Sequence, residues 1–366
     1  MPPDSFATSA EPNICVVAAP GTDTGRGNLL GIQPCMEPRD YATAESFRAK
    51  LDSYLAEAWR QGWLGGRAIV VLPEYLGSWL VVAGAHPSVY AAARVEDAMR
   101  RLIRDDLPGF ARAALATWGR RRSEHAPWPG AFDWVKDALF RMRAPQMASI
   151  YHSVFSGLAR DYGVTIVAGS LLLPAPTVKD GALKPGSGPL QNVSVLYHPD
   201  GRADSRLARK LFLITDEQPF TAPGTLADLP IFDTPAGRLG VVICADSWYP
   251  QVYKALEQHG MDFVAVPSYL APDGVWQRPW QGYNGASPPA DVDPADVGTL
   301  AEGEAWRKYA LAGRIGASGA RCGVNVFLRG SLWDLGADGA SLAVRDGEVT
   351  EVPYTARGAI VNLWLP

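Results

Sequence analysis

Apolar residues along this chain gather in short continuous runs, and between the runs they recur at helical spacing. The runs are bounded by Gly, Pro or Asp and are too continuous for strands with one face in water. They fit β-strands that are buried on both faces, or that have a second sheet behind them. The eight runs are Ile14–Ala19, Ala68–Leu72, Val164–Ala168, Val193–Tyr197, Leu239–Ala245, Phe263–Val266, Val324–Leu328 and Ala359–Leu365.

Helical stretches separate several of these runs. Thr43–Gln61 and Gln146–Tyr162 each carry one apolar stripe, and Gly62 and Gly163 follow them as helix stop signals. A shorter helix is expected over Pro250–His259, because proline favours the first turn of a helix. Alternating strands and helices indicate an α/β fold.

Two segments interrupt this alternation. Residues 95–145 are rich in Arg and Trp and are predicted to be largely helical. Residues 271–298 contain many prolines without periodicity and predict a long loop, which is usually functional or mobile. Near the end of the chain, Asp346-Gly347 is typical of a hairpin turn, so the sheet is expected to be mixed.

Composition narrows the class of protein. The 366 residues are 47% hydrophobic and 20% charged, which excludes disordered and fibrous classes. Lys and Arg total 34 against 38 Asp and Glu, and the resulting net charge of −4 gives no field that would attract nucleic acid or acidic lipid. No apolar run reaches the roughly 18 residues of a membrane span, and the polar first residues, Met1–Asn13, lead us to expect no signal peptide.

The four cysteines are sparse and contain no Cys-x-x-Cys pair, which argues against a disulfide framework and a thiolate zinc site. We therefore expect a soluble protein of a reducing, cytoplasmic compartment that binds neither nucleic acid nor membrane.

Three reactive side chains stand near the ends of predicted strands. Glu74 follows the run that ends at Leu72, where partial desolvation would raise the pKa of its carboxyl towards that of a working base; an ordinary turn carboxylate is the alternative. Lys210 could stabilise an oxyanion as a point charge, although a single lysine is usually a solvated surface residue. Cys244 ends a strand and precedes a helix, a setting that can activate a thiol; an inert buried cysteine is the alternative.

The order Glu, Lys, Cys and the residues around each make this chain resemble the nitrilase superfamily of carbon–nitrogen hydrolases. The matching strings are Val71-Leu72-Pro73-Glu74-Tyr75, Arg209-Lys210-Leu211-Phe212-Leu213 and Gly237-Arg238-Leu239-Gly240-Val241-Val242-Ile243-Cys244-Ala245-Asp246. Further similar strings are Asn192–Leu196, Pro199–Gly201, Phe220–Gly224 and Phe232–Gly237. The resemblance extends from about Ile14 to Leu365.

The resemblance implies an α/β fold, a four-layer αββα sandwich with two mixed β-sheets. It implies one carbon–nitrogen hydrolase domain over residues 1–366, with insertions at 95–145 and 271–298. It also implies a homodimer or higher homo-oligomer and a reaction that needs no organic cofactor and no metal.

The resemblance further implies catalytic roles. Glu74 would take the thiol proton and later pass it to the leaving amine, while Cys244 attacks the substrate carbon. Lys210 and the backbone amide of Ala245 would hold the oxyanion, and water would then release the acid. Many members carry a second glutamate after the lysine, and Glu217 is the nearest match, with Asp216 beside it leaving the register open. Glu217 would position the substrate or orient Lys210.

The expected ligand is a small amide or nitrile. Side chains near the strand ends are expected to line its pocket, with core packing as the alternative: Tyr75, Ala245, Trp248, Tyr249 and Tyr269. Nitrile-cleaving relatives carry Trp-Glu after the cysteine, so Ala245-Asp246 favours amides. A nitrilase or carbamoyl-amide hydrolase with the same triad remains open, as does a non-catalytic binding or scaffold relative on the same fold.

Overall fold

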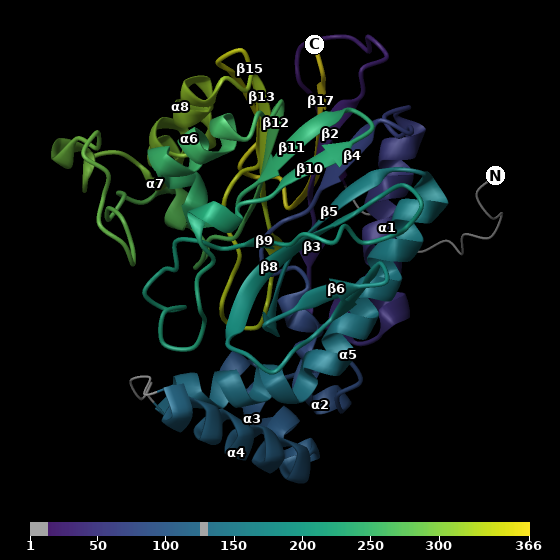
Figure 1. Cartoon of the computed structure of the whole chain (residues 1–366), viewed down its shortest axis with the longest axis vertical. Coiled ribbons are helices and arrows are strands. Elements are labelled where there is room, and N and C mark those ends of the chain that lie inside the picture. The colour runs from purple at the N-terminus through teal and green to yellow at the C-terminus, as the bar shows by residue number, and fades with distance from the viewer. Residues whose placement is uncertain (1–13, 125–130) are drawn as a thin grey trace.

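Two mixed β-sheets face each other at the centre of the molecule, and helices cover the outer face of each (Figure 1). The computed structural model describes residues 14–124 and 131–366. The expected αββα sandwich is confirmed.

The first sheet has seven strands in the order β1-β17-β2-β4-β5-β8-β9. β2, β4 and β5 are parallel neighbours, whereas β8 and β9 are added antiparallel. The strands are β1 (Ile14–Ala18), β2 (Asn28–Gln33), β4 (Ala68–Val71), β5 (Thr165–Pro174), β8 (Leu190–Tyr197), β9 (Ala208–Arg209) and β17 (Gly358–Trp364).

The second sheet has six strands in the order β10-β11-β12-β13-β15-β16, with β11, β12 and β13 parallel. They are β10 (Ile231–Thr234), β11 (Gly237–Val241), β12 (Phe263–Ser268), β13 (Cys322–Phe327), β15 (Leu342–Arg345) and β16 (Glu348–Glu351). Two small pairs complete the strands: β3 (Cys35–Met36) with β14 (Arg329–Gly330), and β6 (Thr177–Lys179) with β7 (Ala182–Lys184).

The outer layers come from different parts of the chain. α1 (Ala44–Arg60) and α5 (Ala131–Tyr162) cover the seven-stranded sheet, and α6 (Pro250–Gln258), α7 (Glu302–Tyr309) and α8 (Leu311–Arg314) cover the six-stranded sheet. At the lower end in Figure 1 lie α2 (Pro87–Tyr90), α3 (Val95–Asp105) and α4 (Leu107–Glu124).

The sandwich explains why the strands read as continuous apolar runs. In β4, Ile69 and Val71 pack between the two sheets, while Val70 and the following Leu72 pack against the helical layer. Both faces of the strand are therefore dry, and neither face selects polar residues. Each of the eight predicted runs overlaps a strand of the structure.

Several boundaries differ from the prediction, and two of these differences change the type or the length of an element. The run ending at Ala245 leaves its strand after Val241, because the chain turns sharply into the short 3₁₀ helix η4 (Cys244–Trp248). The helix predicted to begin at Gln146 begins at Ala131 and continues through Pro145, a residue that usually ends a helix. α5 packs along α4 and against β5 of the seven-stranded sheet.

Residues 271–298 are irregular, as predicted, apart from two single 3₁₀ turns, η5 (Val275–Gln277) and η6 (Pro294–Asp296). The two tryptophans of this loop, Trp276 and Trp280, are buried.

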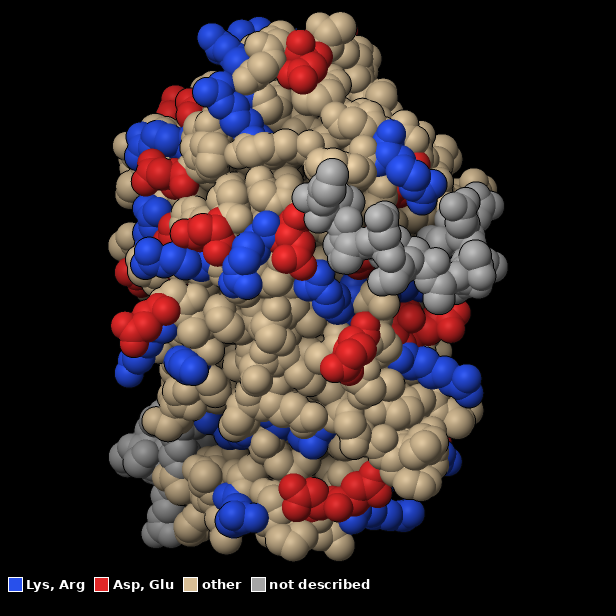
Figure 2. Space-filling view, turned by 90° about the vertical axis from the view of Figure 1, so that its right-hand side faces the viewer, with Lys and Arg blue, Asp and Glu red and all other residues tan. Residues whose placement is uncertain are grey.

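Charges of both signs are interspersed on the face shown in Figure 2. Ion pairs at α1 include Arg48–Asp161 and Lys50–Asp40. Within the described part of the chain, every helix is too short or too polar to cross a membrane.

A bulge in β5 supports the turn that carries Glu74. The pairing of β5 with β8 shifts register between Val167 and Ser170, and Gly169 has φ +70°. Ser170 receives the Tyr75 amide on its Oγ at 2.9 Å and donates its own amide to the Pro73 carbonyl at 3.2 Å. A Cβ on Gly169 would lie 2.2 Å from the Pro73 carbonyl oxygen.

We expect Gly169→Ala to destabilise the fold more than Gly163→Ala does. Both glycines have positive φ, but a Cβ on Gly163 meets nothing within 4 Å, so that variant carries backbone strain alone. The contact with Pro73 should add about 1–3 kcal/mol. Urea unfolding of both variants measures the difference, and equal unfolding free energies would contradict the close approach.

Candidate active site

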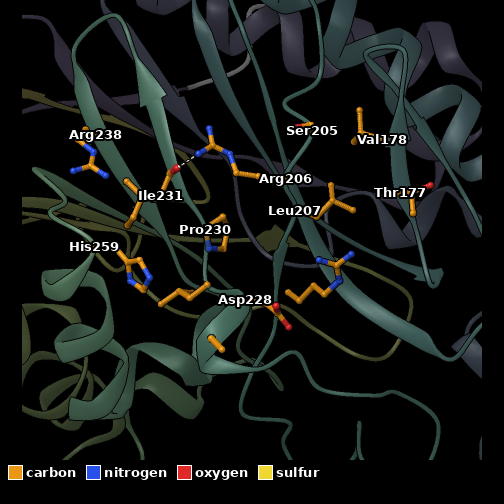
Figure 3. A pocket seen from close by; sticks show the side chains of 13 residues that line it. Thr177, Val178, Ser205, Arg206, Leu207, Asp228, Pro230, Ile231, Arg238 and His259 are labelled. Carbon is orange, nitrogen blue, oxygen red and sulfur yellow. Dashed lines mark hydrogen bonds between the residues drawn. The ribbon is translucent and has the colours of Figure 1, made fainter.

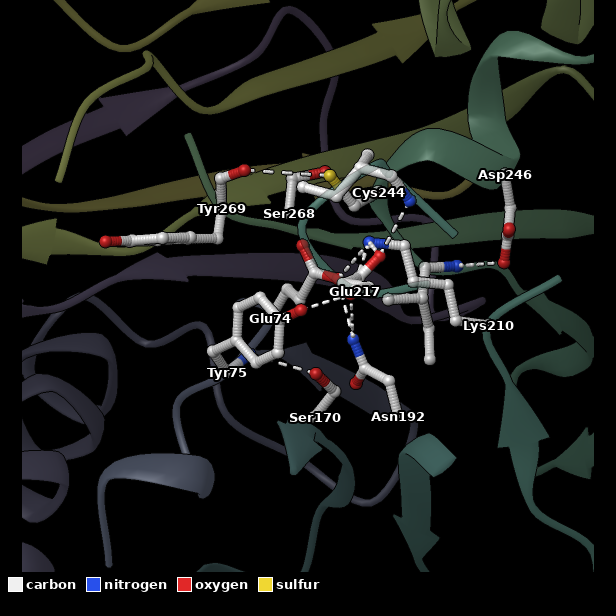
Figure 4. Close-up of polar contacts among 12 residues, drawn as sticks. Glu74, Tyr75, Ser170, Asn192, Lys210, Glu217, Cys244, Asp246, Ser268 and Tyr269 are labelled. Carbon is white, nitrogen blue, oxygen red and sulfur yellow. Dashed lines mark hydrogen bonds and ion pairs between the residues drawn. The ribbon is translucent and has the colours of Figure 1, made fainter. Parts of the chain in front are cut away.

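The three reactive side chains singled out by the sequence converge at one place between the sheets. Glu74 follows β4, Lys210 follows β9 and Cys244 follows β11 at the start of η4. Figure 4 shows their side chains pointing toward one another from these separate segments. Only 1% of Glu74 and 1% of Lys210 are exposed, and Cys244 is buried as well.

Lys210 is a buried cation between two carboxylates. Its Nζ lies 2.8 Å from Glu74 Oε1 and 2.8 Å from Glu217 Oε2. Burying an ammonium is unfavourable unless it is paired and hydrogen-bonded, and here two acceptors meet that requirement. Lys210 is therefore not a solvated surface lysine, which was the alternative considered from the sequence.

Glu217 is held in place by several donors. The Tyr75 hydroxyl donates to its Oε1, and the Ile214 amide donates to its Oε2 at 3.0 Å. Glu217 is buried, whereas the neighbouring Asp216 is exposed. The side chain that faces Lys210 is therefore that of Glu217.

Asn192 belongs to the same cluster, although no catalytic role was predicted for it. Its Nδ2 donates to Glu74 Oε1 at 2.9 Å and lies 3.3 Å from Glu217 Oε1. Its backbone carbonyl accepts the backbone amide of Lys210 at 2.9 Å. In the sequence, Asn192 was noted only as the first residue of the string Asn192–Leu196. That string is similar to the superfamily, but it does not indicate which residues Asn192 contacts.

The backbone at Cys244 is strained. Its φ of +50° lies in the left-handed region, which is unfavourable for a residue with a side chain. The Sγ lies 3.6 Å from the Tyr269 carbonyl oxygen and within hydrogen-bonding reach of the Glu74 carboxyl. The turn thus aims the thiol at Glu74.

Burial dominates the protonation of the cluster. It raises the pKa of the Glu74 carboxyl, against the opposing effect of Lys210. Burial together with the Glu74 charge raises the pKa of the Cys244 thiol well above its usual value. Burial alone would lower the pKa of Lys210, but Glu217 and Glu74 outweigh it and raise that pKa. These shifts favour a neutral thiol at Cys244 and a charged ammonium at Lys210.

The residues expected to line the pocket separate into two groups. Tyr75 and Tyr269 pack edge to face beside the cluster, with ring centroids 5.8 Å apart, and both are partly exposed. Ala245 is also partly exposed. Tyr249 stacks on Phe212 at 3.7 Å, and Trp248 is buried in an aromatic cluster behind the turn. That aromatic cluster consists of Trp248, Trp280, Tyr283 and Trp306.

A separate cavity of about 790 Å³ opens near β9 and β10 and contains none of the expected site residues (Figure 3). Arg206, Arg209 and Arg238 line it, but Arg206 already binds Asp204 and the Ile231 carbonyl. Arg209 binds Gln191 and the Pro176 carbonyl. Across residues 14–124 and 131–366, His, Cys, Asp and Glu form no group of three suited to a metal ion.

Solved structures share this fold. An amidase from Nesterenkonia sp. superposes with a TM-score of 0.55 at 16% identity, covering 93% of this chain and 90% of that one. Another structure of the amidase from Nesterenkonia sp. AN1, named NitN, gives a TM-score of 0.56 at 17% identity and covers 93% of each chain.

Curated relatives match over shorter stretches. A nitrilase from Pyrococcus abyssi is 34% identical over 113 residues, which is 31% of this chain and 37% of that protein. A probable hydrolase of Bacillus subtilis, YhcX, is 23% identical over 154 residues, which is 40% of this chain and 28% of that protein. The matched part thus spans about a third of these relatives.

The model of the carbon–nitrogen hydrolase family matches residues 31–285, which includes Glu74, Lys210, Glu217 and Cys244. This match covers well over half of the chain and confirms the resemblance found in the sequence. The chain belongs to the carbon–nitrogen hydrolase family.

Proposed function

We propose that this protein is a thiol hydrolase that cleaves the non-peptide C–N bond of a small amide through a thioester on Cys244. The observation that carries this proposal is the buried Lys210 between Glu74 and Glu217, directly beside a thiol on a strained turn. A packing role alone would not require a carboxylate base, a cation and a nucleophile at one point.

In the first step, Glu74 takes the thiol proton while the sulfur attacks the carbonyl carbon of the amide. The raised pKa of Glu74 makes its carboxylate a stronger base than a solvated glutamate. The new C–S bond places the negative charge on the substrate oxygen. The Lys210 ammonium, which already contacts Glu74 Oε1 and both Glu217 carboxylate oxygens, would be the first donor and would stabilise this oxyanion through its charge. The Ala245 amide would be the second donor.

In the second step, Glu74 returns the proton to the leaving nitrogen, the C–N bond breaks and ammonia or an amine departs. Water then attacks the thioester with Glu74 again as the base, and the thiol takes back its proton as the acid is released. Glu217 keeps Lys210 in place and, through Tyr75, fixes one wall of the site.

The amide preference has support from similar proteins. For the Nesterenkonia amidase, one variant binds butyramide, and another carries the acetamide moiety of fluoroacetamide on its active-site cysteine. The Pyrococcus abyssi relative is named a nitrilase, so nitrile cleavage is the second candidate. We favour amides because Ala245 stands where nitrile-cleaving relatives carry a tryptophan.

We also propose one hydrolase domain with insertions at 95–145 and 271–298, and a homodimer or higher homo-oligomer. Leu107 and Leu115 on α4 are 57% and 69% exposed, which supplies apolar surface for a partner to cover. A reducing, cytoplasmic compartment is supported by the four free cysteines.

We expect a covalent acyl adduct on Cys244. Intact mass spectrometry of protein quenched with a slowly cleaved amide should show the adduct, and Cys244→Ala should lack both the adduct and turnover. Cys15→Ala is the matched control, because Cys15 lies on the edge strand β1 away from the cluster. Turnover by Cys244→Ala would contradict the mechanism.

We expect Lys210→Met to lower the free energy of unfolding by about 3–5 kcal/mol, because it leaves buried carboxylates without their cation. The loss should grow from pH 5 to pH 8. Burial already raises the pKa of Glu74, and removing the opposing Lys210 raises it further, so the folded state holds this proton more tightly than the unfolded state and loses stability as the pH rises.

Urea unfolding at the two pH values measures this effect. The double variant Lys210→Met/Glu74→Gln removes one of the stranded carboxylates and should regain part of the stability. A Lys210→Met protein as stable as the wild type at pH 8 would show that the ion pairs are not stabilising.

We expect a higher kcat/KM for an amide than for the nitrile with the same acyl group. Each oxyanion donor contributes about 2.7–4 kcal/mol, and nitrile attack forms a thioimidate nitrogen in place of the oxyanion. Matching the acyl group cancels differences in its binding. A nitrile that is the better substrate would reverse the preference and leave the triad in place.

A further inference from the structure

Lys210 and Cys244 lie on segments that no strand pairing joins. Lys210 follows β9 in the seven-stranded sheet, and Cys244 follows β11 in the six-stranded sheet. Residues 210–217 and 242–249 are all described, and no backbone–backbone hydrogen bond connects the two segments. Their relative position must therefore depend on side chains.

The side chain of Asp246 connects the two segments by hydrogen bonds. Asp246 Oδ1 accepts the Leu211 amide at 2.9 Å and the Phe212 amide at 2.7 Å. Its Oδ2 accepts the Ile243 amide at 3.1 Å. Asp246 is fully buried, and the dashed line in Figure 4 shows its carboxylate reaching across to the Lys210 segment.

We propose that Asp246 is a positioning residue that fixes the Lys210 ammonium relative to the Cys244 thiol by clamping the backbone on both sides. This inference rests on the proposed hydrolase function. Asp246 touches neither the substrate carbon nor the thiol in that mechanism, so it acts through the residues that do.

The chemistry of a carboxylate suits this task. Only an ionised carboxylate offers two acceptor oxygens and no donor, so it can receive three amides at once. Burial raises the pKa of Asp246 to about 7, against the hydrogen bonds and the Lys210 charge that lower it. Asp246 is fully buried, so its carboxylate needs hydrogen-bond partners from the protein, and the three amides supply them.

A second contact lies across the same boundary. Phe212, whose amide Asp246 holds, stacks on Tyr249 with the ring planes within 10° of parallel. Tyr249 ends η4, so this contact also joins the lysine segment to the cysteine turn. The stack restrains separation of the segments, but the directional hydrogen bonds of Asp246 set their register.

The test compares Asp246→Asn with Asp204→Asn. Asparagine keeps the shape of aspartate but presents an NH₂ group to either Ile243 or the Leu211–Phe212 pair, so one side of the clamp is lost. Asp204 is a matched control, because it too is buried and accepts a backbone amide, that of Arg206, outside the site. Amide hydrolysis kinetics and hydrogen exchange at single-residue resolution are measured on the full chain.

For Asp246→Asn we expect kcat to fall about 10–100-fold with KM within about threefold of the wild type, since a misplacement of about 1 Å can cost 10²-fold. Exchange should accelerate at Leu211, Phe212 or Ile243. Asp204→Asn should keep the wild-type kcat. A kcat within twofold of the wild type for Asp246→Asn, or an equal loss in Asp204→Asn, would overturn the proposal.

Hydrogen exchange in the wild type gives a measurement that needs neither activity nor a folded variant. The Leu211 and Phe212 amides should exchange far more slowly than the amide of the exposed Asp216 in the same segment. Equal rates would overturn the clamp even if the hydrolase function holds. If no amide is cleaved while these amides are protected and Asp246→Asn releases them, the proposed function fails and the clamp is supported.

Discussion

The buried ammonium of Lys210 is the constraint on which the rest of the site depends. A charge that is shielded from solvent needs partners within the protein. The partners of Lys210 come from three segments that are distant in the sequence: Glu74 after β4, Glu217 on the loop beyond β9, and Asn192 of β8. Asn192 accepts the Lys210 backbone amide and contacts both carboxylates. The cluster can form only when the seven-stranded sheet has assembled. The interactions that stabilise this fold therefore also set the geometry of the site.

The strands could be predicted because both faces of each sheet are dry, so the sequence contains uninterrupted apolar runs. β2 was not predicted, although it is central to its sheet. Its apolar run is broken by Gly31, where a Cβ would lie 2.9 Å from Val361 and 3.0 Å from Val326. Those two valines belong to different sheets, so the glycine lies where the two sheets approach each other closely. The spacing of apolar residues along the sequence does not show such a tertiary contact. α7 was not predicted for another reason: its exposed face is strongly charged, and its buried Trp306 packs against Trp248 of η4 and Phe327 of β13, which are distant in the sequence.

The residues of the site likewise divide into those that the sequence predicted and those that it did not. Glu74, Lys210 and Cys244 could be found because reactive side chains after apolar runs are unusual, and their order strengthened each one. Asn192 and Asp246 could not be assigned from the sequence, since an amide or a carboxylate next to a strand is compatible with an ordinary turn. Their importance comes from the atoms that face them: two carboxylates for Asn192 and three backbone amides for Asp246. Trp248 shows the converse, because an aromatic residue four positions after the cysteine packs behind the turn and not beside the thiol.

The arrangement also explains how a buried site can carry out the proposed proton transfer. Before attack, the negative charge that Lys210 balances lies on Glu74 and Glu217, and the thiol is neutral because burial raises its pKa. After attack, the proton has moved to Glu74 and the charge has moved to the substrate oxygen, so the total charge of the cluster is the same. An ammonium that lies between the old and the new position of that charge serves both states without a large rearrangement of its surroundings. Glu217 supports this arrangement, because it contacts Lys210 in addition to Glu74, so that Lys210 keeps a carboxyl partner when Glu74 takes the proton.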